Sequence, residues 1–139
     1  MKALIDVNVV LDVLLDREPH AAASAAVWAA IEVGVAKGVL AAHAITTIHY
    51  LVRKERGNAK AKDTIAAILR VFGVAAVDET AIRNALALPF GDFEDAVTAA
   101  TAQTVGCDLI VSRNPRDFRG SPVRVLAPEA AAHIFAQGQ

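Results

Sequence analysis

The stretch KALIDVNVVLD, residues 2–12, decides how the chain can fold. Its apolar run from Ala3 to Ile5 is too short for a helix and is typical of a buried strand, and Asp6 follows it directly. A buried parallel strand that ends in a carboxylate points that charge out of its C-terminal edge, where open α/β sheets bind ligands. Asp6 is therefore a candidate functional residue. The alternative is a capping or turn residue, a common role for Asp at this position.

Two further segments repeat this association of apolar and acidic residues. GDFEDAVTAATAQ spans residues 91–103, and CDLIVSRNPRDF spans residues 107–118 with a second buried strand from Leu109 to Val111. Carboxylates gathered at one edge of a sheet from distant parts of the chain repel one another unless a positive charge lies between them. A divalent cation is the obvious candidate for that charge.

Strand and helix patterns alternate along the whole chain. Expected strands span residues 2–7, 39–42, 74–77, 108–112 and 123–126. Expected helices span residues 8–16, 19–37, 48–56, 58–72, 79–88 and 93–105, with a last one from residue 128; Asn8 caps the first, Gly38 ends the second, and Thr46 or Thr47 caps the third. The alternation predicts a single α/β domain over residues 1–139, a three-layer α/β/α fold with a mostly parallel central sheet of about five strands.

Composition limits the class of protein. Hydrophobic residues make up 55% of the 139 positions, enough for a buried sheet, and the excess suggests a homodimer. The one cysteine, Cys107, excludes an internal disulfide and suits a reducing compartment. No segment has the pattern of a signal peptide or a membrane span, so we expect a soluble cytoplasmic protein.

Charge is unevenly distributed although the net charge is only −1. Basic residues cluster between residues 53 and 62 and again between residues 113 and 124. Arg53, Lys54, Arg113 and Arg116 are the candidate contacts to a nucleic-acid backbone. The alternative is that these clusters are solvated helix faces.

The acidic candidates have structural alternatives as well. Asp92 and Asp95 have the spacing of a capping box, although the small apolar residues around Asp95 suggest an inward carboxylate that needs a partner. Asp117 could cap the turn that follows Ser112 or form an ion pair with Arg116 or Arg119. Ser112 and Asn114 could satisfy backbone groups or hold water or metal. The four histidines lack metal-ligand spacing, and neither a phosphate-binding loop nor a nucleophile elbow is present.

The three segments, in this order and at these distances, resemble the PIN domain family, the metal-dependent ribonuclease fold of VapC-type toxins. The resemblance covers essentially the whole chain. It implies a PIN-like fold that binds Mg²⁺ or Mn²⁺ through Asp6, Asp95 and Asp117, with Asp92 and Asn8 as helpers. It also implies an antitoxin partner that inserts a basic side chain among the carboxylates.

One position departs from the family pattern. The family usually has a glutamate at the start of the helix after the second strand, whereas residues 44–50 here read AITTIHY and contain no carboxylate. Thr46 or Thr47 could hydrogen-bond a metal-bound water but does not replace the charge, so weaker Mg²⁺ binding is expected. Asn114 stands where many members have an acidic residue.

Three functions follow as hypotheses. The first is an endoribonuclease in which Mg²⁺ or Mn²⁺ activates a water for attack on RNA. The second is a catalytically weakened PIN-like module that binds RNA or a protein partner. The third is a phosphoacceptor domain, which the absence of a lysine after the strand at residues 108–112 disfavours.

Overall fold

Five parallel strands form one sheet in the order β3-β2-β1-β4-β5 in the computed structural model, which describes residues 1–138. The strands are β1 (Lys2–Ile5), β2 (Lys37–Ala41), β3 (Gly73–Ala75), β4 (Leu109–Val111) and β5 (Val125–Leu126). β1 lies in the centre, and β4 pairs with it although more than a hundred residues separate them. The predicted parallel sheet of about five strands is confirmed.

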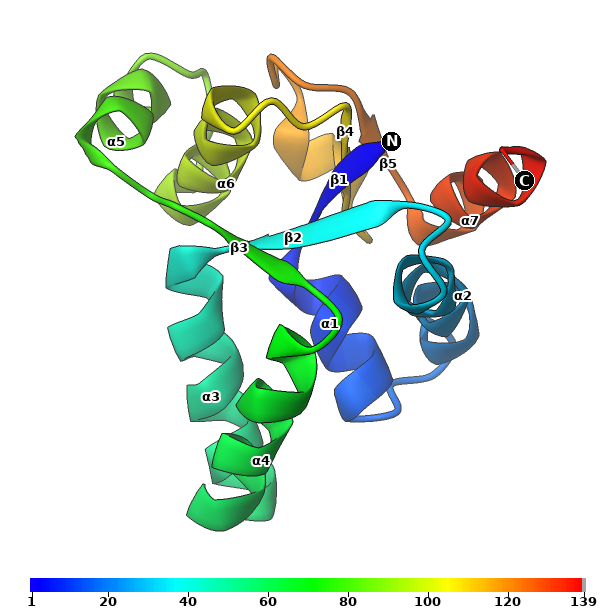
Figure 1. The fold of residues 1–139 in the computed structure, drawn as a ribbon. Helices are drawn as coiled ribbons and strands as arrows, with labels where there is room; N and C mark the ends of the chain where they lie inside the picture. Colours follow the sequence, from blue (N-terminus) through cyan, green and yellow to red (C-terminus); the bar gives the residue numbers. More distant parts are fainter. Residues whose placement is uncertain (139) are drawn as a thin grey trace.

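Helices cover both faces of this sheet (Figure 1). One face carries α5 (Glu79–Leu86) and α6 (Phe93–Thr104), and the short 3₁₀ helix η1 (Pro115–Phe118) lies against α6. The other face carries α1 (Val7–Leu14), α2 (Ala21–Glu32), α3 (Ala42–Arg56), α4 (Asn58–Leu69) and α7 (Pro128–Gln137). The architecture is the predicted three-layer α/β/α fold.

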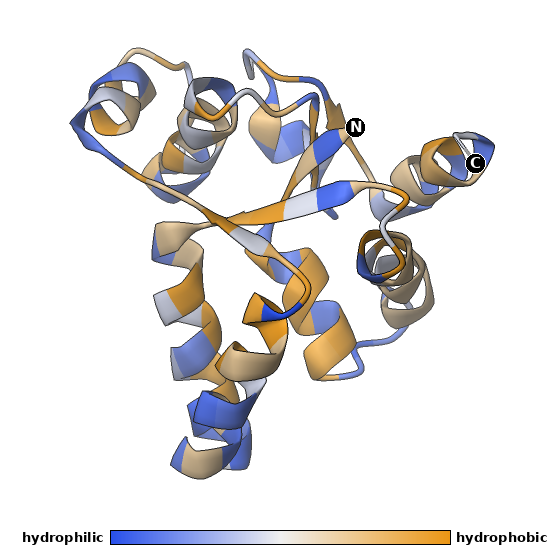
Figure 2. Cartoon of the chain, viewed as in Figure 1, coloured by the Kyte–Doolittle hydropathy of each residue, from blue (hydrophilic) through white to orange (hydrophobic). Residues whose placement is uncertain are grey.

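The central strands are apolar at residues 3–5 and 109–111, because both faces of the sheet are buried there. Ala3 and Ile5 of β1 belong to the core beneath α1, α2 and α3, whereas Leu4 points to the opposite core beneath α6. Ile110 of β4 lies on the same side as Leu4. In Figure 2 the strands are mostly hydrophobic apart from the hydrophilic starts of β1 and β2, and several of the surrounding helices alternate hydrophobic and hydrophilic segments.

The expected boundary between the second helix and the second strand is wrong. α2 ends at Glu32, and Lys37 and Gly38 already belong to β2. Gly34, with φ of 87°, makes the turn instead. Gly38 is required for packing, since a Cβ there would lie 2.6 Å from Cδ1 of Ile31.

Two expected helix caps are also wrong. Asp6, rather than Asn8, is the N-cap of α1. α3 begins at Ala42, directly after β2, so Thr46 and Thr47 lie inside the helix. The Thr46 hydroxyl donates a hydrogen bond to the carbonyl of His43, a backbone contact that Thr makes within helices as well as at caps.

The differences between the expected and the observed boundaries of α2, β2 and α3 do not affect the carboxyl edge of the sheet, where the candidate residues lie. The C-terminal ends of β1 and β4 are neighbours, and α1 and η1 begin just beyond them. None of the helices formed by residues 1–138 combines the length and the apolar character needed to cross a membrane.

Candidate metal and catalytic site

Asp6 lies at the centre of the carboxyl edge of the sheet. Its backbone N–H donates to the carbonyl of Val111 at 2.9 Å, which places it at the end of β1 beside β4. Its Oδ1 accepts from the backbone N–H of Val7 at 2.8 Å, and its Oδ2 accepts from the Ser112 hydroxyl at 2.8 Å. Asp6 and Ser112 are both buried. The capping role considered from the sequence is therefore observed for Asp6, at the expected C-terminal end of β1.

The turn after β4 is held to α1 and to Ser112. The backbone N–H of Arg113 donates to Oδ1 of Asn8 at 3.4 Å, and the N–H of Asn114 donates to the Ser112 hydroxyl at 3.2 Å. Asn8 and Ser112 thus support the turn. Asn114 contributes its backbone, while its side chain is exposed.

η1 brings Asp117 to the same edge. Its Phe118 is 3% exposed and packs edge-on against Phe90, with ring centroids 5.8 Å apart. The N–H of Asp117 donates to the carbonyl of Asn114 at 3.0 Å. This anchoring leaves the Asp117 side chain exposed beside the site.

Asp92 and Asp95 begin α6. Asp92 is the N-cap, and its Oδ1 accepts from the N–H of Asp95 at 3.0 Å, as the capping alternative required. Asp95 is half-buried and shares a pocket of about 410 Å³ with Asp92 and Asp117. Arg116 and Arg119 line the same pocket, so cationic side chains flank the carboxylates.

The electrostatics of the edge are those of crowded carboxylates. Burial raises the pKa of Asp95 to about 7, and the charges of Asp6, Asp92, Asp117 and Glu94 contribute. Burial also raises the pKa of Asp6, although hydrogen bonds from Ser112 and Val7 oppose the rise. Asp6, Asp95 and Asp117 are thus close enough for their charges to act on one another.

Glu94 is an acidic neighbour of Asp6 that sequence reasoning did not assign to the site. The two side chains line a common gap with Ala44, at the start of α3, and Thr98. Glu94 raises the pKa of Asp6 and of Asp95. The signal that could have found it is the helical spacing of Glu94 and Thr98, which places both on the α6 face toward α3.

The donor set suits a hard divalent cation, since it consists of carboxylate and hydroxyl oxygens. The pKa values of Asp6 and Asp95 are raised by burial first and by neighbouring carboxylates second, and a bound cation would oppose both effects. Among residues 1–138, however, no three His, Cys, Asp or Glu side chains converge closely enough to hold one ion. The residues therefore fit a metal in chemistry and charge, but they are not gathered at coordination distance.

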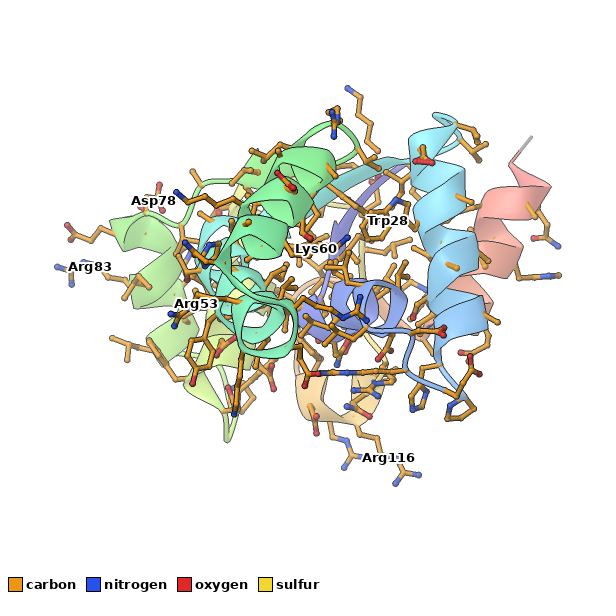
Figure 3. All side chains as sticks on the ribbon, turned by 90° about the horizontal axis from the view of Figure 1, so that it is seen from below. Trp28, Arg53, Lys60, Asp78, Arg83 and Arg116 are labelled. Carbon is orange, nitrogen blue, oxygen red and sulfur yellow. The ribbon has the colours of Figure 1, made fainter. Side chains whose placement is uncertain are left out.

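Several residues that the sequence predicts for the site lie away from the carboxylates. Arg53 and Lys54 lie in the last turn of α3, about 16 Å of helix beyond its start at the sheet edge. Arg53 stacks over Tyr50, 5.8 Å from the ring centre. Figure 3 shows Arg53 and Lys60 on α3 and α4, apart from the outward-pointing Arg116. Thr47 lies within α3 and, in the part of the chain that is described, makes no side-chain hydrogen bond.

Arg113 is also placed differently from a free RNA contact. Its guanidinium Nη1 lies 3.5 Å from Oδ1 of Asp12, a fully buried residue of α1. Arg113 still lines a pocket of about 490 Å³ together with Arg116 and Asp117. Arg116, by contrast, is exposed and also lines the pocket that contains Asp95. Arg116 is the predicted basic residue that lies beside the carboxylates with its charge accessible.

Solved structures with the same fold include toxins of toxin–antitoxin pairs. DNA-bound VapBC from Salmonella typhimurium has a TM-score of 0.70 at 15% identity, covering 92% of this chain and 98% of that chain. FitAcB from Neisseria gonorrhoeae has a TM-score of 0.67 at 19% identity, covering 91% and 97%. VapC20 from Mycobacterium tuberculosis, a sarcin-ricin loop cleaving toxin, has a TM-score of 0.61 at 15% identity, covering 78% and 86%.

Among curated protein sequences, none matches this chain. The family model described as PIN domain matches residues 2–116, which include β1, the start of α6 and the turn after β4. The order of the strands, the acidic edge and this match lead to the same assignment. The chain belongs to the PIN domain family.

Proposed function

We propose that the protein is a Mg²⁺- or Mn²⁺-dependent endoribonuclease that hydrolyses phosphodiester bonds of RNA. The observation that carries the proposal is the group of carboxylates around Asp6 and Asp95, whose pKa values are raised at the edge where parallel sheets bind ligands. Family membership supports the proposal, as does the cleaving activity of the structurally similar VapC20.

The proposed ligands are Asp6, Asp95 and Asp117, with Asp92 as a helper. When bound, the cation would lower the pKa of a coordinated water and neutralise charge on the scissile phosphate. Ser112 would orient Asp6, to which it already donates a hydrogen bond. Asn8 and the Asn114 backbone would hold the turn that precedes Asp117.

Glu94 would supply the negative charge that α3 lacks. Glu94 lies beside Asp6 and Ala44. Ala44 is in the first turn of α3, the part of the fold where the family usually has a glutamate. Its carboxylate would add to the charge that attracts the cation, because affinity depends on the charge of the ligand set.

Arg116 and Arg119 would bind the RNA backbone next to the scissile phosphate. Both line the pocket that contains Asp95 and Asp117, and both are exposed. Arg53 and Lys54 would contact RNA only at a distance from the reacting bond.

A protein antitoxin is the proposed partner. VapBC and FitAcB are complexes of this kind, and this chain covers nearly the full length of the matching chains. A basic side chain of the antitoxin would pair with the carboxylates around Asp95. A homodimer and a cytoplasmic location, expected from composition, stay predictions.

A binding module without catalysis is the second candidate. It is favoured by the lack of a carboxylate at the start of α3 and by the separation of the acidic side chains across the described residues. Such a module would retain RNA in the presence of Mg²⁺ without cleaving it, and added salt would weaken the binding.

The test is a calorimetric titration of Mn²⁺ and Mg²⁺ into the wild type and the Asp6→Asn variant, with RNA cleavage measured on the same preparations. Asp63→Asn, which changes an exposed residue of α4, is the matched control. We expect Asp6→Asn to lose metal binding and cleavage together while Asp63→Asn keeps both. Wild-type cleavage by Asp6→Asn would refute the assignment, and a wild type that binds RNA but no metal at millimolar concentration would establish the binding module.

A further inference from the structure

Arg113 is held by two residues of α1 that lie one helical turn apart. Oδ1 of Asn8 accepts from the Arg113 backbone N–H at 3.4 Å, and Oδ1 of Asp12 lies 3.5 Å from its Nη1. Residues four apart on a helix share a face, so α1 contacts both the backbone and the side chain of Arg113 from one side.

Asp12 is buried completely, with 0% exposure, and the Arg113 side chain is 26% exposed. In the described part of the chain, neither carboxylate oxygen of Asp12 accepts a hydrogen bond. The Arg113 guanidinium is therefore the group that compensates this charge. The buried carboxylate of Asp12 would be strongly destabilising without a positive partner. Moving the Arg113 side chain away from it is therefore unfavourable.

Fixing Arg113 also fixes its neighbours along the turn. Ser112, on one side, donates to Asp6. Asn114, on the other side, donates its N–H to Ser112 and accepts from the N–H of Asp117. A displacement of Arg113 would therefore move the hydrogen-bond donor of one proposed ligand and the backbone of another.

We propose that Asp12 and Arg113 are positioning residues, a buried ion pair that holds the turn from Ser112 to Asp117 in place against Asp6. Arg113 then acts through the turn rather than by contact with RNA. Asp12 is beyond the reach of any substrate because it has no exposed surface. The inference rests on the proposed function, since the turn carries a ligand of the proposed metal site.

The first measurement does not require metal. Hydrogen–deuterium exchange of residues 112–118 is compared in the wild type, Asp12→Asn, Arg113→Gln and, as a matched control, Arg116→Gln. We expect exchange about tenfold faster at this turn in Asp12→Asn and Arg113→Gln, with α5 unchanged, because local opening becomes easier. Arg116→Gln should exchange like the wild type. Wild-type exchange in Asp12→Asn would overturn the proposal.

The second measurement separates positioning from RNA contact. Mn²⁺ affinity is measured by calorimetry, and the affinity for a single-stranded RNA oligonucleotide is measured as a function of salt, without divalent cations. Asp12→Asn and Arg113→Gln should each weaken Mn²⁺ binding about tenfold and keep the wild-type salt slope. Arg116→Gln should reduce the slope by about 0.7, the value for one charge on a single strand. A reduced slope in Arg113→Gln would overturn the proposal.

Two further variants address coupling and folding. The double variant Asp12→Asn/Arg113→Gln should lose no more Mn²⁺ affinity than either single variant, because both act on one pair. Arg113→Lys keeps the positive charge and should recover much of the loss, which provides the test if Arg113→Gln fails to fold. Lower stability of Asp12→Asn with unchanged Mn²⁺ affinity and exchange would indicate a purely structural pair and overturn the proposal. If the wild type binds no Mn²⁺, the proposed function is refuted but this inference is not. Hydrogen–deuterium exchange of residues 112–118 would then decide whether Asp12 and Arg113 hold the turn.

Discussion

Ser112 donates a hydrogen bond of 2.8 Å to Asp6, and the two residues are 106 positions apart. Both side chains are buried, and they join the ends of the neighbouring strands β1 and β4. Asp6 combines this bond with its role as the N-cap of α1. One carboxylate thus links a strand, a helix and the turn that leads to Asp117.

Replacing Ser112 by Ala should destabilise the fold by about 1–3 kcal/mol, because Oδ2 of Asp6 loses its donor while it stays buried. Urea unfolding at pH 7 measures the change. Thr64→Ala removes an exposed hydroxyl of α4 and should change stability by less than about 0.5 kcal/mol. Equal losses in the two variants would show that the bond to Asp6 contributes nothing specific.

The Asp95→Asn variant should be more thermally stable than the wild type at pH 8 in the presence of a chelator. The folded protein holds the Asp95 proton more tightly than the unfolded chain, because burial and neighbouring charges raise its pKa from 3.8 to about 7. Stability therefore falls as the pH rises from about 4 through about 7. The melting temperatures of variant and wild type should approach each other at pH 4. An equal melting temperature at pH 8 would contradict the raised pKa.

Glu94→Gln should lower the pKa of Asp95, since the Glu94 charge raises it. Carboxyl titration followed by NMR measures this shift without metal. The same variant should weaken Mn²⁺ binding by on the order of 1 kcal/mol, about fivefold. Glu129→Gln changes an exposed residue in the first turn of α7 and should alter neither quantity. Unchanged Mn²⁺ affinity in Glu94→Gln would remove Glu94 from the proposed site.

Gly38→Ala should destabilise the protein by about 1–3 kcal/mol through overpacking. The added Cβ would lie 2.6 Å and 2.9 Å from two carbons of Ile31 and 3.0 Å from Cδ1 of Phe72. Gly91→Ala meets nothing within 4 Å and serves as the control in the same unfolding assay. A neutral Gly38→Ala would mean that α2 moves away from the sheet at little cost.

Most of the fold was predictable because its strands are short apolar runs between helical patterns. The centre of the sheet followed from residues 3–5 and 109–111, which are buried on both faces. The boundary between α2 and β2 was not predictable from composition. In the sequence, Gly38 resembles the glycine that ends a helix. In the structure it lies in β2, where Ile31 and Phe72 leave no room for a side chain.

The candidate site was predictable where strand ends determine position. Asp6 and Ser112 follow neighbouring strands, so the parallel topology brings them together. Glu94 was missed because its neighbour Asp6 is remote in sequence. The ion pair of Asp12 with Arg113 was missed for the same reason, because its two residues are far apart in sequence. From the sequence alone, Arg113 resembles an ordinary basic surface residue. The catalytic roles of these residues stay predictions.

The strand order also has a consequence for biosynthesis. β1, β2 and β3 come from the first 75 residues, but β4, the partner of β1 on its other side, comes after residue 108. In a growing chain Asp6 is therefore made well before Asp95, Ser112 and Asp117. Contacts between such remote segments are also slow to form, since loop closure precedes them. A ribosome that stalls before β4 would hold a chain without Ser112 and Asp117, so the proposed site could form only after β4 and the turn behind it have been made.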